Sequence, residues 1–387
     1  MAYRPKYVQQ PSGKPEGGKG NIPALLPITG SLLLTAVLLA QLLLTPGSLK
    51  QNTRLDTDVA GRIRRHFDTR VEDLLLEFSG GESGKPAYRL EDRDLIAPVP
   101  DPACYGTAAT AAELSWLPEA AAALLEGQDT LFTSQTQVKD SFGVRYYLDE
   151  TILAITWKEA VDGSTYTFSE VKIAHPSQFR RFLSEGVYGS GVQRTTTEMS
   201  QSVNAVVASS GDYYDYREFG IVVNEGMVYR AKGELLDTCY IDDRGDLVFS
   251  YAGQLTDQET VERFVEENSV RFSLSFGPVM IEEEQVVVPP FYNSGEINKD
   301  YARAALCQLG PLHYVLVTAN MEDPCYNVPT VKQFAENLHA MGIPRAYALD
   351  GGQTAAIAMD SQLINTVSYG CQREISDIIY FATALPE

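Results

Sequence analysis

The stretch Arg345–Phe381, RAYALDGGQTAAIAMDSQLINTVSYGCQREISDIIYF, places one acidic residue at the end of an apolar run. Asp350 ends this run and is followed directly by Gly351 and Gly352. An apolar strand that ends in this way presents the acid at the rim of a sheet, where the glycines let a ligand approach the backbone closely. Asp-Gly is also the commonest signal of a tight hairpin turn, so a purely structural turn is the alternative.

The residues before Asp350 predict a strand, a helix and a second strand. His313–Thr318 is rich in β-branched residues and predicts a strand. Thr330 and Gln333 form a capping-box pattern at the start of the helix. The helix then carries apolar residues at helical spacing, namely Val331, Phe334, Ala335, Leu338 and Met341. This order puts Asp350 at the carboxyl end of a strand, where α/β-type layers commonly carry a site.

Four short segments together resemble the phosphodiester glycosidase family, which includes N-acetylglucosamine-1-phosphodiester α-N-acetylglucosaminidase and bacterial exopolysaccharide-related proteins. The segment ALDGGQTA at 348–355 resembles the family's N-L-D-G-G-G-S-S pattern, and REISD at 373–377 resembles its R-x-(I/V)-S-D pattern. SGDYY at 210–214 resembles N-G-D-Y-Y, and YARAA at 301–305 resembles P-R-T-A-I. The resemblance covers residues 146–381, roughly two-thirds of the chain.

The resemblance implies hydrolysis of a sugar-1-phosphodiester, and the residue types fit that chemistry. A phosphate monoester leaves more readily than an alcohol, so less acid assistance is needed than in ordinary glycoside hydrolysis. The reaction needs a cation for the phosphate and a carboxylate for water or for the oxocarbenium-like state. A guanidinium fork suits the phosphate. The expected catalytic residues are Asp350, Asp212, Arg303 and Arg373. The expected substrate-binding residues are Gly351, Gly352, Gln353, Thr354, Tyr213 and Asp377.

The same residues have structural alternatives. Arg373 and Asp377 could form an ion pair with each other, and Tyr213 could pack in the core instead of stacking on a sugar. Arg303 has no obvious partner nearby in the sequence, which favours a functional role.

The chain departs from the family pattern at several positions. These are Ser210, Ala302, Ala304, Gln353 and Ala355. The departures are consistent with a divergent substrate or with lost activity. The expected function is therefore hydrolysis of a phosphate-linked envelope or exopolysaccharide glycan. A catalytically inactive glycan-binding protein is the alternative, and a structural envelope protein without a cleft is a third possibility.

Charge and cysteine content exclude some other functions. The 387 residues carry a net charge of −20, and residues 51–387 carry 26 Lys and Arg against 50 acids. So negative a chain repels nucleic-acid phosphates, and we expect no nucleic-acid partner. The five cysteines are widely spaced, so we expect no metal site and mostly free thiols, with Cys307–Cys325 as the first candidate for a bridge. No cofactor motif is present, and we expect no cofactor.

The N-terminal region predicts a membrane anchor. Residues 22–45 form an apolar run without charge, preceded by four basic residues in 1–21. This predicts a cytoplasmic tail, a single-pass signal anchor and an extracytoplasmic C-terminal domain in the cell membrane. A cleaved signal peptide is the alternative. Residues 46–140 predict a mostly helical membrane-proximal region, whose amphipathic segment 56–78 could mediate self-association.

Residues 141–387 predict the phosphodiester glycosidase-like domain, with a texture rich in strands. Strands are expected at 152–157, 165–173, 203–208, 219–223 and 247–251, and helices at 177–186 and 257–268. The turns Asn224–Gly226 and Asp243–Asp246 predict hairpins. The expected fold class is α+β, with mixed β-sheets and packed helices.

Overall fold

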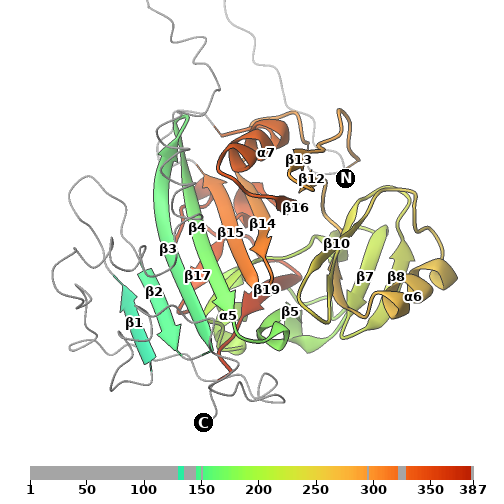
Figure 1. Ribbon diagram of the computed structural model, residues 1–387, viewed down its shortest axis with the longest axis horizontal. Helices are drawn as coiled ribbons and strands as arrows, with labels where there is room; N and C mark the ends of the chain where they lie inside the picture. Colours follow the sequence, from blue (N-terminus) through green and yellow to red (C-terminus); the bar gives the residue numbers. More distant parts are fainter. Residues whose placement is uncertain (1–129, 135–144, 150, 294–295, 321–327, 385–387) are drawn as a thin grey trace, which may run out of the picture. The chain divides into compact units, whose positions relative to one another are not determined.

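The computed structural model describes residues 130–134, 145–149, 151–293, 296–320 and 328–384, all within one compact unit of the chain. A nine-stranded sheet is the largest element, and all its neighbouring strands run antiparallel (Figure 1). Its strands, in spatial order, are β1 (Thr130–Ser134), β2 (Arg145–Asp149), β3 (Ile152–Val161), β4 (Ser164–Ile173), β15 (His313–Asn320), β14 (Arg303–Gly310), β16 (Arg345–Leu349), β12 (Val279–Glu282) and β13 (Gln285–Val286).

Three smaller antiparallel sheets and three α-helices complete the described structure. The five-stranded sheet consists of β18 (Gln362–Leu363), β17 (Ile357–Met359), β6 (Val207–Ser210), β19 (Asp377–Phe381) and β5 (Phe179–Leu183). The others are β10 (Leu247–Ser250), β9 (Thr238–Asp242) and β11 (Val270–Leu274), and the hairpin of β7 (Gly220–Asn224) and β8 (Met227–Lys232). The helices are α5 (Thr196–Ser202), α6 (Gln258–Glu267) and α7 (Val331–Ala340).

The nine-stranded sheet buries both of its faces. Because side chains alternate along a strand, Ala305 and Cys307 of β14 join the apolar cluster under α7, whereas Ala304 and Leu306 join the cluster on the opposite face. That second cluster also contains residues of the five-stranded sheet, among them Phe179, Val207, Ile357 and Phe381. The central strands are therefore covered by α7 on one side and by the smaller sheets on the other.

Local sequence signals explain why α7 forms next to β16. The Thr330 side chain accepts a hydrogen bond from the Gln333 N–H, and the Gln333 side chain accepts one from the Thr330 N–H, as the capping box predicts. Phe334 and Leu338 pack into the cluster beneath the helix. Gly342, with φ at +91°, ends the helical segment. β16 follows within three residues and positions Asp350 directly after its last residue.

The expected fold class is wrong in its balance of elements. In the described residues β-strands far outweigh helices, and the three α-helices have only seven to ten residues each. The sheets are antiparallel rather than mixed, as every strand pairing shows. The periodic patterns of α6 and α7 stand out in the sequence, whereas two- and three-residue strands such as β17 and β18 carry no pattern. The expected fold class therefore gives helices too large a share of the domain.

The transmembrane helix within that fold class finds no support. Of the helices in the described ranges, none is long and apolar enough to cross a membrane. The apolar run at 22–45 and the amphipathic segment at 56–78 lie outside the described residues.

One expected helix is a strand, and most other elements are confirmed. Residues 177–186 contain β5 flanked by single turns at Pro176–Gln178 and Ser184–Gly186. Alternate residues of β5 are buried, namely Phe179, Arg181 and Leu183, because the strand pairs with β19. The expected strands are present as β3, β4, β7, β10 and β15, the 203–208 strand starts only at Val207, and α6 matches the expected helix at 257–268.

Candidate active site

Asp350 directly follows β16, in a turn that lies beside the start of β14. The Gly352 N–H donates to the Ala302 carbonyl oxygen at 2.7 Å, which ties this turn to the chain just before β14. A Cβ on Gly351 would lie 2.5 Å from the same oxygen, so no other residue fits without a shift. Gly352 adopts φ +64°, which favours glycine. Both glycines are therefore required by the path of the chain beside Asp350.

The Asp350 carboxylate has one unsatisfied oxygen atom. Its Oδ2 atom is buried and has no hydrogen-bond partner, although the residue as a whole is partly exposed. Burial raises the pKa of Asp350 to about 6, against the opposing effects of Thr354 and of the positive charges of Arg217 and Arg373. A carboxylate with a free oxygen and a pKa near neutrality is equipped to accept a proton.

Arg373 is held near Asp350 by two stacked aromatic rings. Tyr213 and Tyr216 stack with their centroids 4.4 Å apart and 9° between their planes. The Arg373 guanidinium lies 5.4 Å from the Tyr213 centroid and 4.9 Å from that of Tyr216, and it donates to the Tyr213 hydroxyl at 3.2 Å. Burial acts to lower the pKa of Arg373, but its contacts with the two tyrosines and the charge of Asp350 outweigh it and raise that pKa.

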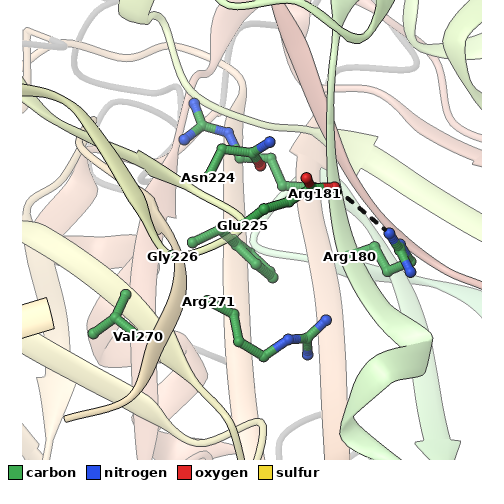
Figure 2. A pocket seen from close by; sticks show the side chains of 8 residues that line it. Arg180, Arg181, Asn224, Glu225, Gly226, Val270 and Arg271 are labelled. Atoms are coloured by element: carbon green, nitrogen blue, oxygen red, sulfur yellow. Dashed lines mark ion pairs between the residues drawn. The ribbon is translucent and has the colours of Figure 1, made fainter. Parts of the chain in front are cut away.

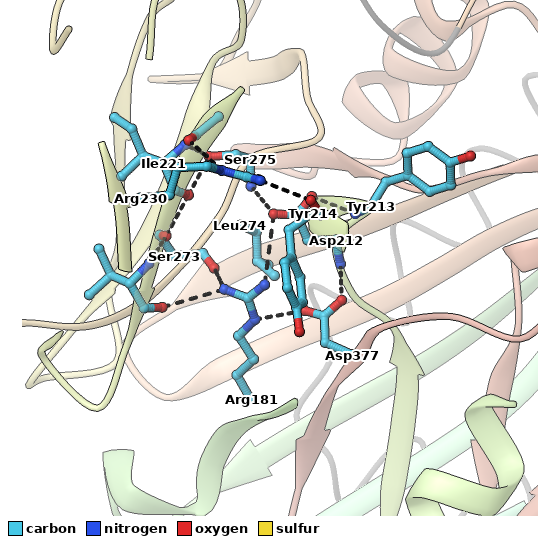
Figure 3. A network of polar contacts seen from close by, with 12 residues as sticks. Arg181, Asp212, Tyr213, Tyr214, Ile221, Arg230, Ser273, Leu274, Ser275 and Asp377 are labelled. Atoms are coloured by element: carbon cyan, nitrogen blue, oxygen red, sulfur yellow. Dashed lines mark hydrogen bonds and ion pairs between the residues drawn. The ribbon is translucent and has the colours of Figure 1, made fainter. Parts of the chain in front are cut away.

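A buried ion-pair network lies behind this surface (Figure 3). Arg181 Nε donates to Asp377 Oδ2 at 2.6 Å, and its Nη2 lies 3.8 Å from Asp212 Oδ2, with all three side chains fully buried. Asp377 Oδ1 accepts the Asp212 N–H at 2.9 Å, and Asp212 Oδ2 accepts the Ser275 N–H at 2.9 Å. Arg217 pairs with the other oxygen of Asp212 and donates to the Ser275 carbonyl at 2.6 Å.

These contacts hold the backbone on either side of the ion-pair network, and the predicted roles of Asp212 in catalysis and of Asp377 in substrate binding remain predictions. Burial acts to raise the pKa of Asp212, but Arg217 and Arg181 outweigh it and lower that pKa, so this carboxylate stays ionised. Burial raises the pKa of Asp377, with Arg181 opposing the shift. Both carboxylates are occupied by arginines and backbone N–H groups. In Figure 3 the Tyr213 ring points away from this network.

The structural alternative, an ion pair between Arg373 and Asp377, is not formed, because Asp377 pairs with Arg181 and Arg373 lies against the tyrosines. The Arg303 side chain is likewise used by the backbone. It is buried, donates to the carbonyl of Pro329 at 3.0 Å and also bonds the carbonyl of Lys299. Burial lowers the pKa of Arg303 to about 10. Its predicted role in phosphate binding remains a prediction.

The remaining predicted residues line the same turn. Thr354 Oγ1 donates to the Gly351 carbonyl at 2.6 Å. The Gln353 side chain donates to the Cys371 carbonyl at 3.1 Å and lies 3.1 Å from the Cys371 sulfur, which ties the Asp350 turn to the segment that carries Arg373. Cys371 is an exposed free thiol, and Cys239 and Cys307 are buried free thiols. These free thiols agree with the expectation of mostly unpaired cysteines. Cys307, the first candidate for a bridge, is among them, and Cys325 lies outside the described residues.

The sequence predictions omitted three residues that organise the site. Arg181 falls within the helix expected at 177–186. The alternation of apolar residues at Phe179 and Leu183 is the signal that indicates a strand with Arg181 facing inward. Arg217 lies three residues after the SGDYY segment and is not among the expected site residues, yet its charge acts on Asp350 and its guanidinium pairs with Asp212. Ser275 follows β11 with no local signal. It contacts Asp212 from 63 positions away, which a single sequence does not reveal.

A separate cavity of about 440 Å³ opens at the Asn224–Gly226 turn (Figure 2). Arg180, Arg271 and Glu225 line it, and Arg180 lies 4.0 Å from Glu225. None of the predicted site residues lines this cavity. Within the described ranges no group of three or more His, Cys, Asp or Glu side chains could hold a metal ion.

Comparison with known proteins defines the class of this domain. Residues 203–382 match the model of the phosphodiester glycosidase family. This stretch contains Asp212, Asp350, Arg373 and Asp377. This match confirms the resemblance that the four segments carry, and it supports a hydrolase of the glycosidase type.

Individual relatives are distant. The chain is 21% identical over 260 residues to the SPbeta prophage-derived uncharacterized protein YomE of Bacillus subtilis (strain 168). That match covers 65% of this chain and 38% of the relative's length. The catalytic domain of zebrafish N-acetylglucosamine-1-phosphodiester alpha-N-acetylglucosaminidase is similar with a TM-score of 0.49 and 15% identity, over 66% of this chain and 88% of that domain. A hypothetical protein from Synechocystis gives a TM-score of 0.45 and 13% identity, over 65% of this chain and 68% of its own.

Proposed function

We propose that the domain hydrolyses a sugar-1-phosphodiester bond in a phosphate-linked glycan. The observation that carries this proposal is the free, buried Oδ2 of Asp350 beside an arginine on an aromatic stack. In this reaction a water oxygen attacks the anomeric carbon, and the bond from that carbon to the phosphate oxygen breaks. The phosphate monoester leaves with the bonding electrons, and the proton of the water passes to Asp350.

Arg373 is the proposed phosphate ligand. It is exposed, and the Tyr213–Tyr216 stack restricts its motion while leaving guanidinium N–H groups for a ligand. The charge of Arg217 adds to the positive potential at Asp350. On a chain with a net charge of −20, such a local cationic site is what an anionic substrate requires.

A glycan-binding protein without activity is the second candidate. It is favoured by the full engagement of Asp212 and Asp377, which leaves Asp350 as the one predicted site carboxylate with a free oxygen. Ordinary glycosidases use two carboxylates. A good leaving group removes the need for the second one, which is why we favour the hydrolase.

The test is release of phosphate monoester from a panel of sugar-1-phosphodiesters by the full-length protein. If the protein turns these substrates over, Arg373→Lys should raise KM about tenfold or more, because a lysine cannot reproduce the stacked, forked contact with the phosphate. Arg194→Lys is the matched control, since Arg194 is an exposed arginine paired with Glu185. Saturable binding of the panel without turnover, unchanged in Asp350→Asn, would favour the binding protein. The predicted extracytoplasmic location remains part of the proposal, and protease accessibility of the domain in intact cells would test it.

A further inference from the structure

Two exposed tyrosines border the Asp350 turn. Tyr369 is 92% exposed and Tyr301 is 41% exposed. Tyr369 lies in the single helical turn Ser368–Gly370, and Tyr301 lies two residues before β14. The pKa of Tyr301 is raised mainly by its hydrogen bond with Glu296, and Tyr369 adds a small contribution in the same direction.

The backbone fixes both tyrosines relative to the catalytic turn. The carbonyl of Ala302, next to Tyr301, accepts the Gly352 N–H at 2.7 Å. On the other side, Gln353 donates to the carbonyl of Cys371, two residues after Tyr369. The turns Gly352–Thr354 and Ser368–Gly370 are in contact. Tyr301 and Tyr369 thus flank the segment that carries Asp350.

The backbone of Tyr369 is strained. Its φ of +62° is in the left-handed region, which disfavours a bulky side chain by about 1–3 kcal/mol. Burial of the ring does not offset this cost, because the ring is almost fully exposed. Strained residues of this kind gather at active sites and ligand-binding sites.

We propose that Tyr369 and Tyr301 form a sugar-binding subsite next to the cleavage site, so that the preferred substrate is an oligosaccharide or polymer extended beyond the scissile phosphodiester. This inference rests on the proposed function. A tyrosine offers a flat apolar face and a polar tip, and a pyranose ring offers a flat face of C–H groups with hydroxyls at its edge. Stacking on such a ring adds affinity for a glycan without requiring a charge on the sugar.

The experiment compares three substrates with the same scissile bond. One is a methyl diester of a sugar-1-phosphate, and the other two carry a neutral trisaccharide, either on the phosphate side or on the sugar side. Dissociation constants are measured with full-length Asp350→Asn, so that cleavage does not interfere, and turnover is measured in parallel with the unmodified protein. One of the extended substrates should bind about tenfold tighter than the methyl diester.

Substitutions locate this gain. Tyr369→Ala and Tyr301→Ala, each combined with Asp350→Asn, should abolish the gain and leave methyl-diester binding unchanged, whereas Tyr369→Phe should retain it. Tyr229→Ala is the control, because Tyr229 is 40% exposed but lies on β8. Equal affinity for all three substrates, or a gain that survives both alanine substitutions, overturns the subsite. Absence of turnover in the unmodified protein overturns the proposed reaction and leaves the binding result to be judged separately.

Discussion

At the scale of single residues, the chemistry of the site depends on how burial treats Asp350. Its free Oδ2 is buried while the nearby arginines offset only part of the desolvation. The result is a pKa of about 6 for a group whose ordinary value is 3.8. Asp212, although fully buried, is held ionised by two arginines. The pKa values of these two carboxylates thus shift in opposite directions, because the groups around them differ.

This difference predicts the pH dependence of the reaction. If Asp350 accepts the proton of water, the ionised form is active, and that form predominates above pH 6. The value of kcat/KM should therefore rise about tenfold per pH unit below this pKa and level off above it. Steady-state kinetics between pH 4 and 8 would measure the profile. A rate that falls as pH rises through 6 would show that the protonated form acts instead.

The same residue predicts a trade between stability and activity. Because the folded-state pKa is raised, the folded protein binds a proton more tightly than the unfolded chain, and stability falls as pH rises from about 4 to 6. Asp350→Asn should be more stable than the unmodified protein at pH 7.5, by about 1–2 kcal/mol. The gain should vanish at pH 4. Urea unfolding at the two pH values measures it, and an equal effect at both would contradict the buried-charge explanation.

Replacement of Arg181 should lower the stability of the protein. Its removal in Arg181→Met leaves Asp377 and Asp212 buried with less compensation, which costs about 3–5 kcal/mol of unfolding free energy. Arg194→Met removes one partner of an exposed pair at 3.0 Å and should cost less than about 1 kcal/mol. Urea unfolding of both variants at pH 7.5 provides the comparison. Similar losses of unfolding free energy in the two variants would mean that the buried network contributes no more to stability than an exposed ion pair.

At the scale of elements, the path of the chain after β6 is set by its fit against β19. The Gly211 N–H donates to the Asp377 carbonyl at 3.2 Å, and a Cβ on Gly211 would lie 2.6 Å from Asp377 Oδ2. The Asp377 side chain has no freedom to move, because Arg181 and the Asp212 N–H hold both its oxygens. Gly211 thus brings the SGDYY segment against the strand that follows Arg373.

Gly211→Ala tests this fit. Overpacking against a fixed carboxylate should cost about 1–3 kcal/mol and should also displace Tyr213, which lowers substrate affinity. Gly310→Ala is the control, since a Cβ there meets no atom within 4 Å. It should change stability by less than about 0.5 kcal/mol. Thermal unfolding and KM would be measured for both, and a neutral Gly211→Ala would show that the backbone can relax.

The elements that could be predicted from the sequence are those with local signals. The capping box at Thr330, the helix expected at 257–268 and the strand before Asp350 each match the structure within a few residues. β5 was mistaken for a helix because its pairing with β19, almost 200 residues away, decides its conformation. Short strands such as β13 and β18 exist only through such pairing, which is why the β content was underestimated.

At the scale of the whole described domain, the site is built from segments that are distant in sequence. Asp377 meets Arg181 across 196 positions and Asp212 across 165. The family resemblance supplied Asp350, Arg373, Tyr213 and the glycines, whereas their partners Arg181, Arg217 and Ser275 became visible only in three dimensions. The assignment of Asp212 and Asp377 as substrate-facing residues came from the motif alone, and their contacts show how the motif supports the site from behind.

The most direct test of this account is the hydrolysis rate of a sugar-1-phosphodiester by the full-length protein and by Asp350→Asn at pH 7.5. The account predicts turnover in the unmodified protein and a loss of at least about a thousandfold in the variant, which should stay folded and become more stable. Equal turnover in both proteins would contradict the assignment of Asp350 as the catalytic carboxylate.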